Sequence, residues 1–122
     1  MDQNINTRTF SFFKAPISNC TPKKDMTLED AYDHIRRSSY GQTIKLRTLE
    51  EKDAARAYKS SKFDFCTFSG VFTYRDEQHL VRHSGLLCLD FDHLDDIEGH
   101  FKALSQDPRC PTALLFRSPS GD

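Results

Sequence analysis

Hydrophobic and polar positions follow an alternating or a helical spacing along most of the chain, and this spacing predicts its strands and helices. Alternation in RTFSFFK predicts a strand over residues 9–15. Leu28, Ala31 and Ile35 recur at helical spacing after a Thr27–Asp30 capping signal, which predicts a helix over residues 28–38. The rest of the pattern predicts a short strand at 43–47, a helix within 49–59, strand structure in 62–75, a strand at 85–91, a helix that begins after Asp95 or Asp96 and ends before Pro108, and a strand at 112–117.

The segment GLLCLDF at residues 85–91 is apolar on both faces as far as Asp90. Such a run is typical of a central strand that is covered on both sides. If the strand at 112–117 lies parallel to it, the connection is right-handed and both strands end at one edge of the sheet. The predicted fold is therefore α+β, with a single sheet and helices packed on it. Gly70, inside the 62–75 region, predicts a bulge or a group that approaches the backbone closely.

The composition is that of one soluble domain. The chain has 122 residues, of which 37% are hydrophobic and 29% charged, and we expect a loose segment at 1–8 followed by one domain at 9–122. No apolar run approaches the roughly 20 residues of a membrane span, so no membrane partner is expected. Four cysteines without a close pair indicate reduced thiols in a cytoplasmic protein.

Charge is distributed unevenly along a chain whose formal net charge is only -1. Lysines and arginines are frequent in the first half, whereas acidic residues cluster around 90–98. This polarity suggests a basic surface beside an acidic site. The alternative is that the basic residues are ordinary solvated helix faces.

The first candidate site is the pair Asp90 and Asp92. Residues two apart on a strand point to the same face, so these carboxylates would form one row at the end of the apolar run. Two such carboxylates can hold Mg2+ or Mn2+ together with substrate phosphates. A turn is the alternative for Asp92, and a helix cap is the expected role of Asp95 or Asp96.

The second candidate site is the segment RSPSGD at residues 117–122. Arg117 offers a guanidinium fork, and Ser118, Ser120 and Gly121 offer hydroxyl and backbone N–H groups to phosphate oxygens. A plain Ser-Gly turn is the alternative. The predicted parallel strands would bring this segment beside Asp90 and Asp92 at the sheet edge where α/β ligands bind.

The segment LCLDFDHL, one helix and TALLFRSPSGD together resemble the archaeo-eukaryotic primase, or prim-pol, superfamily, and more closely the VirE N-terminal domain family of Bacteroidetes and mobile elements. Asp90 and Asp92 match the first motif of the superfamily, a strand that ends hydrophobic-Asp-hydrophobic-Asp. Ser118, Ser120 and Gly121 match the beginning of its second motif, and the FSG at 68–70 is also similar.

This resemblance implies an RRM-like sheet on which Asp90 and Asp92 are the catalytic, metal-binding residues. It implies Mg2+ or Mn2+ as cofactor, a nucleoside triphosphate and DNA as partners, and a helicase-like region in the same full-length chain. The second-motif histidine and a third-motif aspartate do not appear, so we expect a fragment of a longer replication or mobile-element protein, incomplete at its C-terminus and inactive alone.

Two other functions are compatible with these motifs. In a haloacid dehalogenase-like phosphohydrolase, Asp90 would be the nucleophile, Asp92 the acid/base and Ser118 a phosphate binder. That family normally carries its motif near the N-terminus, and its later lysine and acidic motifs do not appear here. Alternatively, the domain is a non-catalytic DNA-binding or partner-docking module of the same fold.

Overall fold

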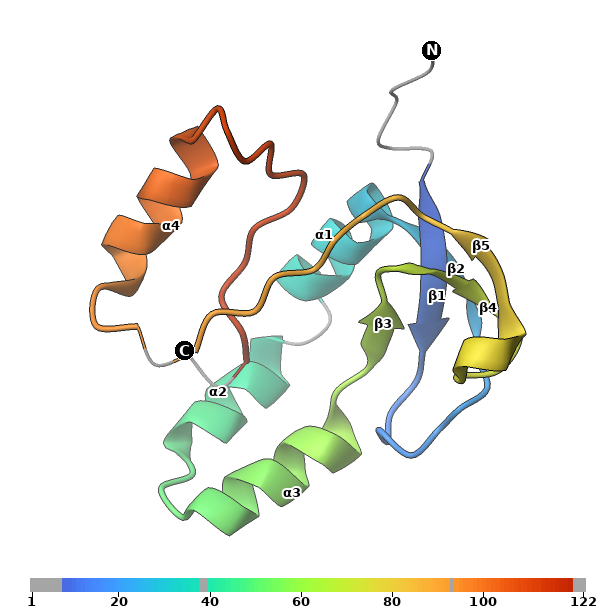
Figure 1. The fold of residues 1–122 in the computed structure, drawn as a ribbon. Helices are drawn as coiled ribbons and strands as arrows, with labels where there is room; N and C mark the ends of the chain where they lie inside the picture. Colours follow the sequence, from blue (N-terminus) through green and yellow to red (C-terminus); the bar gives the residue numbers. More distant parts are fainter. Residues whose placement is uncertain (1–7, 38–39, 93, 120–122) are drawn as a thin grey trace.

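Five short strands form two antiparallel sheets in the computed structural model, which describes residues 8–37, 40–92 and 94–119 (Figure 1). In the first sheet, β1 lies between β2 and β3, and in the second, β4 pairs with β5. The strands are β1 (Thr9–Phe13), β2 (Lys24–Thr27), β3 (Phe65–Thr67), β4 (Gly70–Phe72) and β5 (Leu80–His83). The fold is therefore α+β, as the sequence predicted, but the described residues form two sheets rather than the predicted single one.

Four α-helices accompany the strands in the described part of the chain. They are α1 (Leu28–Arg37), α2 (Tyr40–Thr48), α3 (Lys52–Lys62) and α4 (Ile97–Gln106), and the short 3-10 helix η2 (Glu77–His79) precedes β5. In Figure 1, α1 to α3 lie beside the first sheet, while α4 stands apart and is joined to the rest by two extended segments. None of these helices is long and apolar enough to cross a membrane.

The core is built on β1, which is buried along most of its length. Phe10 and Phe13 of β1 are fully buried, and the core also includes Phe12 of β1, Met26 of β2 and Leu28 of α1. Burying each of these large apolar side chains contributes about 1.5–3 kcal/mol. The alternation of RTFSFFK therefore predicted the right strand, although β1 is covered on both of its faces.

Ser11 is a fully buried polar residue that joins the two sheets. Its hydroxyl oxygen accepts a hydrogen bond from the backbone N–H of Phe72 at 2.8 Å and lies 3.4 Å from the Phe72 carbonyl oxygen. Because a buried hydroxyl without a partner is costly, these bonds fix where β4 lies against β1.

The helix starts were predictable because their signals are local. The Thr27 hydroxyl accepts a hydrogen bond from the Asp30 N–H, and the Asp30 carboxylate accepts one from the Thr27 N–H, which forms the predicted capping box of α1. Asp96, rather than Asp95, caps α4 by accepting from the Gly99 N–H at 3.0 Å. Glu51 caps α3.

Gly70 begins β4 and lies very close to the neighbouring strand. A Cβ atom at Gly70 would meet the Arg82 carbonyl oxygen at 2.2 Å, and the β4–β5 register shifts between Val71 and Phe72. Both predicted explanations of this glycine, the close approach and the bulge, are therefore realised. The strands β2 and β5, by contrast, were not predicted from the sequence.

Three predicted strands are wrong. The segment 43–47 lies inside helix α2, and neither 85–91 nor 112–117 forms a strand. Both edges of β1 are already paired, with β2 and β3, so the later segments cannot form hydrogen bonds with β1 as strands. The chain also leaves the hairpin at Gly85, whose φ of 77° turns the backbone away from the β5 direction. The expected parallel pair does not form among the described residues, the RRM-like core is not confirmed, and Leu87 remains 83% exposed.

Candidate functional site

An open hollow of about 1340 Å³ separates the core from the arm, by which we mean residues 85–92 and 94–119. Phe12, Met26 and Leu28 line its core side, and Ile97 and Phe101 of α4 line its arm side. This volume exceeds the roughly 300–1,000 Å³ of ordinary small-molecule pockets. The hollow is therefore large enough for an extended or polymeric ligand.

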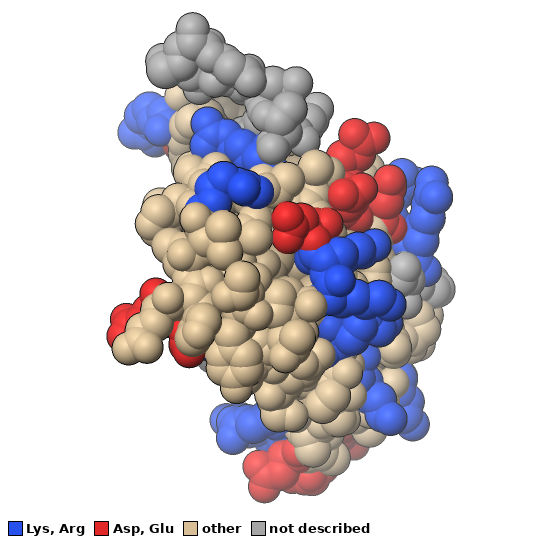
Figure 2. Space-filling model, turned by 90° about the vertical axis from the view of Figure 1, so that its right-hand side faces the viewer, with Lys and Arg blue, Asp and Glu red and all other residues tan. Residues whose placement is uncertain are grey.

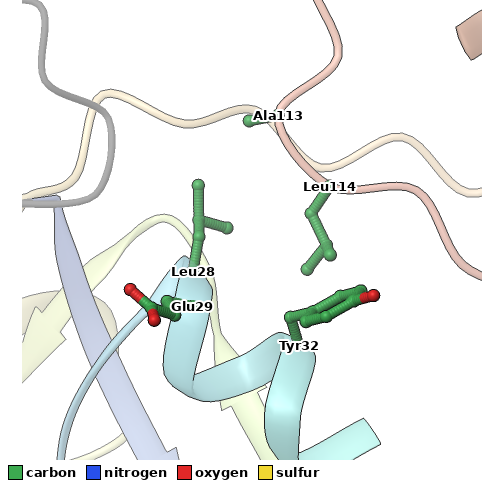
Figure 3. A pocket seen from close by; sticks show the side chains of 5 residues that line it. All are labelled: Leu28, Glu29, Tyr32, Ala113 and Leu114. Carbon is green, nitrogen blue, oxygen red and sulfur yellow. The ribbon is translucent and has the colours of Figure 1, made fainter. Parts of the chain in front are cut away.

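The arm meets the core through a small number of apolar side chains. Leu86 and Leu114 both pack against the core cluster. Leu114 also lines a smaller hollow of about 250 Å³ with Leu28 and Tyr32 of α1, and Figure 3 shows its side chain above the Tyr32 ring. These contacts hold the two extended segments of the arm over α1.

Asp90 lines the large hollow, whereas Asp92 is not among the described residues that line it. Both carboxylates are exposed and lie on a segment without regular secondary structure. No group of three or more His, Cys, Asp or Glu side chains that could hold a metal ion forms within residues 8–37, 40–92 and 94–119. The prediction that Asp90 and Asp92 lie at the end of a strand is therefore wrong. Metal binding by this pair stays a prediction.

Arg117 and Ser118 also line the hollow, so the structure brings them to the same cavity as Asp90. Ser120 and Gly121 lie outside the described residues. Two of the four predicted phosphate-binding residues thus share a cavity with one of the two predicted metal ligands, although the parallel strands that were expected to bring them together do not form.

Arg47 reaches this site from α2, and sequence reasoning missed it. Its guanidinium donates hydrogen bonds to the carbonyl oxygens of Ser118, at 3.1 Å, and Pro119, at 3.2 Å. The segment 43–47 was predicted as a strand, which gave no reason to place Arg47 near residue 118. Its position beside Lys45 in the last turn of a helix would have been the available signal.

The lining of the hollow is positively charged although the whole chain has a formal charge of -1. Acidic side chains contribute only Asp64 and Asp90. The cationic side chains that line it are Arg8, Arg47, Arg56, Lys59, Arg109 and Arg117. A cavity with this excess of cations attracts anionic ligands.

Asp64 is a second feature that the sequence did not reveal. Its carboxylate lies 3.1 Å from Lys14 Nζ and 3.4 Å from His34 Nε2, and it accepts a hydrogen bond from the Ala15 N–H at 2.8 Å. His34 is half-buried and lies edge-on to the Phe12 ring. Asp64 therefore ties the end of β1 to α1 on the core side of the hollow.

Cys66 lines the same hollow without being a plausible nucleophile. Burial, together with the nearby negative charge of Asp64, raises the pKa of the Cys66 thiol to about 12. Because the thiolate is the reactive form, this thiol is inert near neutral pH.

Comparison with known proteins gives one relationship. Residues 57–122, more than half of the chain, match the family model described as BT4734-like, N-terminal domain. The match includes Asp90, Asp92 and the whole RSPSGD segment, whereas Arg47 and β1 lie before it. No curated protein and no solved structure gives a match. The chain belongs to the BT4734-like N-terminal domain family.

Proposed function

We propose that this domain handles nucleotides and DNA in the manner of a primase–polymerase, as its resemblance to the VirE N-terminal domain family implies. The observation that supports the proposal is the shared cavity: Asp90, Arg117 and Ser118 line one hollow in which cations outnumber acids. A nucleoside triphosphate needs such cations for its phosphates and a carboxylate for its metal ion. From the resemblance, we expect the domain to be part of a larger cytoplasmic replication or mobile-element protein that also carries a helicase-like region.

Asp90 and Asp92 are the residues that would hold Mg2+ or Mn2+. Both carboxylates are exposed and two residues apart, and magnesium commonly uses one or two carboxylates, several waters and substrate phosphates. This donor set therefore fits a cation that completes its coordination with water and substrate. Such a cation would neutralise the triphosphate and promote phosphoryl transfer.

The turn that follows Arg117 would bind the phosphates. Arg117 and Ser118 line the hollow, and Arg47 holds the Ser118 and Pro119 carbonyl groups. In this proposal, Arg47 holds the backbone before the turn, and the Arg117 guanidinium and the Ser118 hydroxyl would bind the phosphate oxygens. Ser120 and Gly121 are assigned to the same role from their match to the second motif.

Isothermal titration with Mn2+ and a nucleoside triphosphate tests this function. We expect the native domain to bind both, and the double variant Asp90→Asn with Asp92→Asn to lose at least ten-fold in affinity. Asp95→Asn is the matched control, because Asp95 is exposed in the same acidic segment and caps no helix. Equal losses in the control and the double variant would reject a specific carboxylate site.

A non-catalytic DNA-binding module is the second candidate. It is favoured by one observation: the two aspartates lie on an exposed segment rather than at the end of a packed strand. Under this alternative, DNA binding survives the Asp90→Asn and Asp92→Asn double substitution while no nucleotide binding is measurable in the native domain. Primer synthesis or strand extension by a longer form of the protein would exclude it.

A further inference from the structure

The outward side of α3 carries cations that no acidic side chain neutralises. Lys52, Arg56 and Lys59 recur at i, i+4 and i+7, so they share one side of the helix. None of the three side chains makes a hydrogen bond or ion pair with the part of the chain that the structure describes. Arg56 and Lys59 line the large hollow. We call Lys52, Arg56 and Lys59 the α3 basic face.

Some cations elsewhere in the described part of the molecule pair with acidic side chains. Lys14 pairs with Asp64, and Arg109 pairs with Asp107. On the face shown in Figure 2, Lys and Arg side chains are interspersed with Asp and Glu. At the start of α3, by contrast, the Glu51 carboxylate accepts from the Asp53 and Ala54 N–H groups and is committed to the helix cap. The α3 basic face is therefore a row of three cations on one side of a helix, with no acidic partner among the described residues.

Exposed aromatic side chains lie on the arm side of the same hollow. Phe91, Phe101 and Phe116 line it and are 46%, 40% and 43% exposed. Large apolar side chains are normally buried, so three exposed rings along one cavity indicate a ligand with flat apolar surfaces. The hollow thus offers cations from α3 and exposed rings from the arm.

We infer that this hollow binds a single strand of nucleic acid, with its phosphates along the α3 basic face and its bases against Phe91, Phe101 and Phe116. Proteins that bind single strands combine a cationic groove that follows the backbone with aromatic side chains on which bases stack. Lys52 and Lys59 are about 10 Å apart along the helix axis, at 1.5 Å per residue, a span of two or three phosphates. A duplex fits less well, because its bases are already stacked. The inference rests on the proposed function for the choice of nucleic acid as the polyanion.

Fluorescence anisotropy with a labelled 20-nucleotide oligothymidine tests the inference, with a duplex of equal length as the comparison. We expect tighter binding of the single strand. The double variant Arg56→Ala with Lys59→Ala should lose about ten-fold in affinity, and the slope of log K against log salt should fall by about 1.4, at about 0.7 for each phosphate contact to a single strand. Phe91→Ala with Phe116→Ala should lose at least five-fold with little change in that slope, because stacking is worth about 1–3 kcal/mol per base.

The matched control is Arg36→Ala with Arg37→Ala. It removes the same charge from the end of α1, and neither residue lines the hollow. Equal losses of affinity in the control and the α3 variant would overturn the inference, because they would indicate non-specific electrostatic attraction rather than a binding site. Equal binding of duplex and single strand would also overturn it, as would α3-dependent binding to phosphatidylserine vesicles without binding of the oligonucleotide.

Titration of the α3 variant with Mn2+ and a nucleoside triphosphate separates this inference from the proposed function. If the native domain binds no nucleotide but the oligonucleotide binds through the α3 basic face, the proposed function fails and this inference stands. If nucleotide binds normally and the α3 variant binds the oligonucleotide like the native domain, this inference fails alone.

Discussion

The Arg47 guanidinium donates a hydrogen bond to the carbonyl oxygen of Ser118, with 3.1 Å between Nη2 and that oxygen across 71 residues of sequence. The same side chain donates a second hydrogen bond, to the Pro119 carbonyl oxygen at 3.2 Å, so Arg47 holds the end of the described arm. Helix α2 thereby fixes the position of the segment assigned above to phosphate binding.

Replacing Arg47 with Gln should loosen this end of the arm. Both hydrogen bonds are solvent-exposed, so their net contribution to stability is about 1 kcal/mol. Amide hydrogen exchange in a peptide covering 116–119 should then be about five-fold faster. Lys45→Gln is the control, because its side chain lies on the same helix without these bonds. Unchanged amide exchange in the Arg47 variant would show that these two hydrogen bonds do not hold the arm.

The capping box of α1 should contribute measurably to stability. Asp30→Ala removes the acceptor for the Thr27 N–H, which typically costs about 1 kcal/mol and should lower the Tm by about 3–6 °C. Glu29→Ala removes the same charge from the same helical turn without removing a cap bond, so it isolates the hydrogen bond from the macrodipole term. Thermal unfolding followed by circular dichroism measures both variants, and equal shifts would contradict the capping role.

Local signals in the sequence predicted α1, α3 and α4, but not α2. The capping box of α1, the acid that begins α4 and the proline that follows it act within one helical turn, so no distant residue is needed to interpret them. The segment 43–47 failed because its apolar and polar residues alternate like a strand, yet they lie in α2. Whether such a segment forms a strand or a helix depends on whether a neighbouring strand is available to pair with it. The sequence of the segment does not show this.

The candidate site was harder to predict for the same reason. GLLCLDF has the composition of a central strand, but a central strand needs a partner on each side, and the only strand of the described residues with two partners is β1. Asp90, Arg117 and Ser118 nevertheless line one cavity, and their roles in binding stay predictions. Arg47 and Asp64 were not selected, because each reaches the hollow through tertiary contacts with residues far away in sequence.

Two glycines should respond in opposite directions to the same substitution. Gly70→Ala places a Cβ atom 2.2 Å from the Arg82 carbonyl oxygen, and Gly41→Ala places one where no atom lies within 4 Å. The first should cost about 1–3 kcal/mol through overpacking against backbone that cannot move aside. The second, near the start of α2, should stabilise by roughly 0.5 kcal/mol. Urea unfolding measures both changes, and a neutral Gly70→Ala variant would contradict the close approach of β4 to β5.

Cys66 should be the slowest thiol to react in the folded protein. Burial and the Asp64 charge raise its pKa from 9.0 to about 12, whereas Cys88 is exposed. With a disulfide reagent at pH 8, Cys88 should react within minutes and Cys66 only on unfolding. Cys66→Ala should therefore leave the fast phase unchanged, and Cys88→Ser should remove it. A Cys66 thiol that reacts as fast as Cys88 would show that the strand β3 is not packed as described.

The raised pKa of the Cys66 thiol makes the free energy of unfolding depend on pH. Between pH 9 and 12, the unfolded chain has released the Cys66 proton while the folded chain retains it. The unfolded state therefore binds fewer protons, and the free energy of unfolding falls as the pH rises, by at most about 1.4 kcal/mol per pH unit from this group. Below pH 9 both states hold the proton, and Cys66 contributes no slope. Lysines and tyrosines titrate in the same range, so the comparison is with Cys66→Ala, which should show a shallower decline in urea-unfolding experiments from pH 9 to 11. Identical slopes in the two proteins would mean that the thiol ionises as readily in the folded state as in the unfolded one.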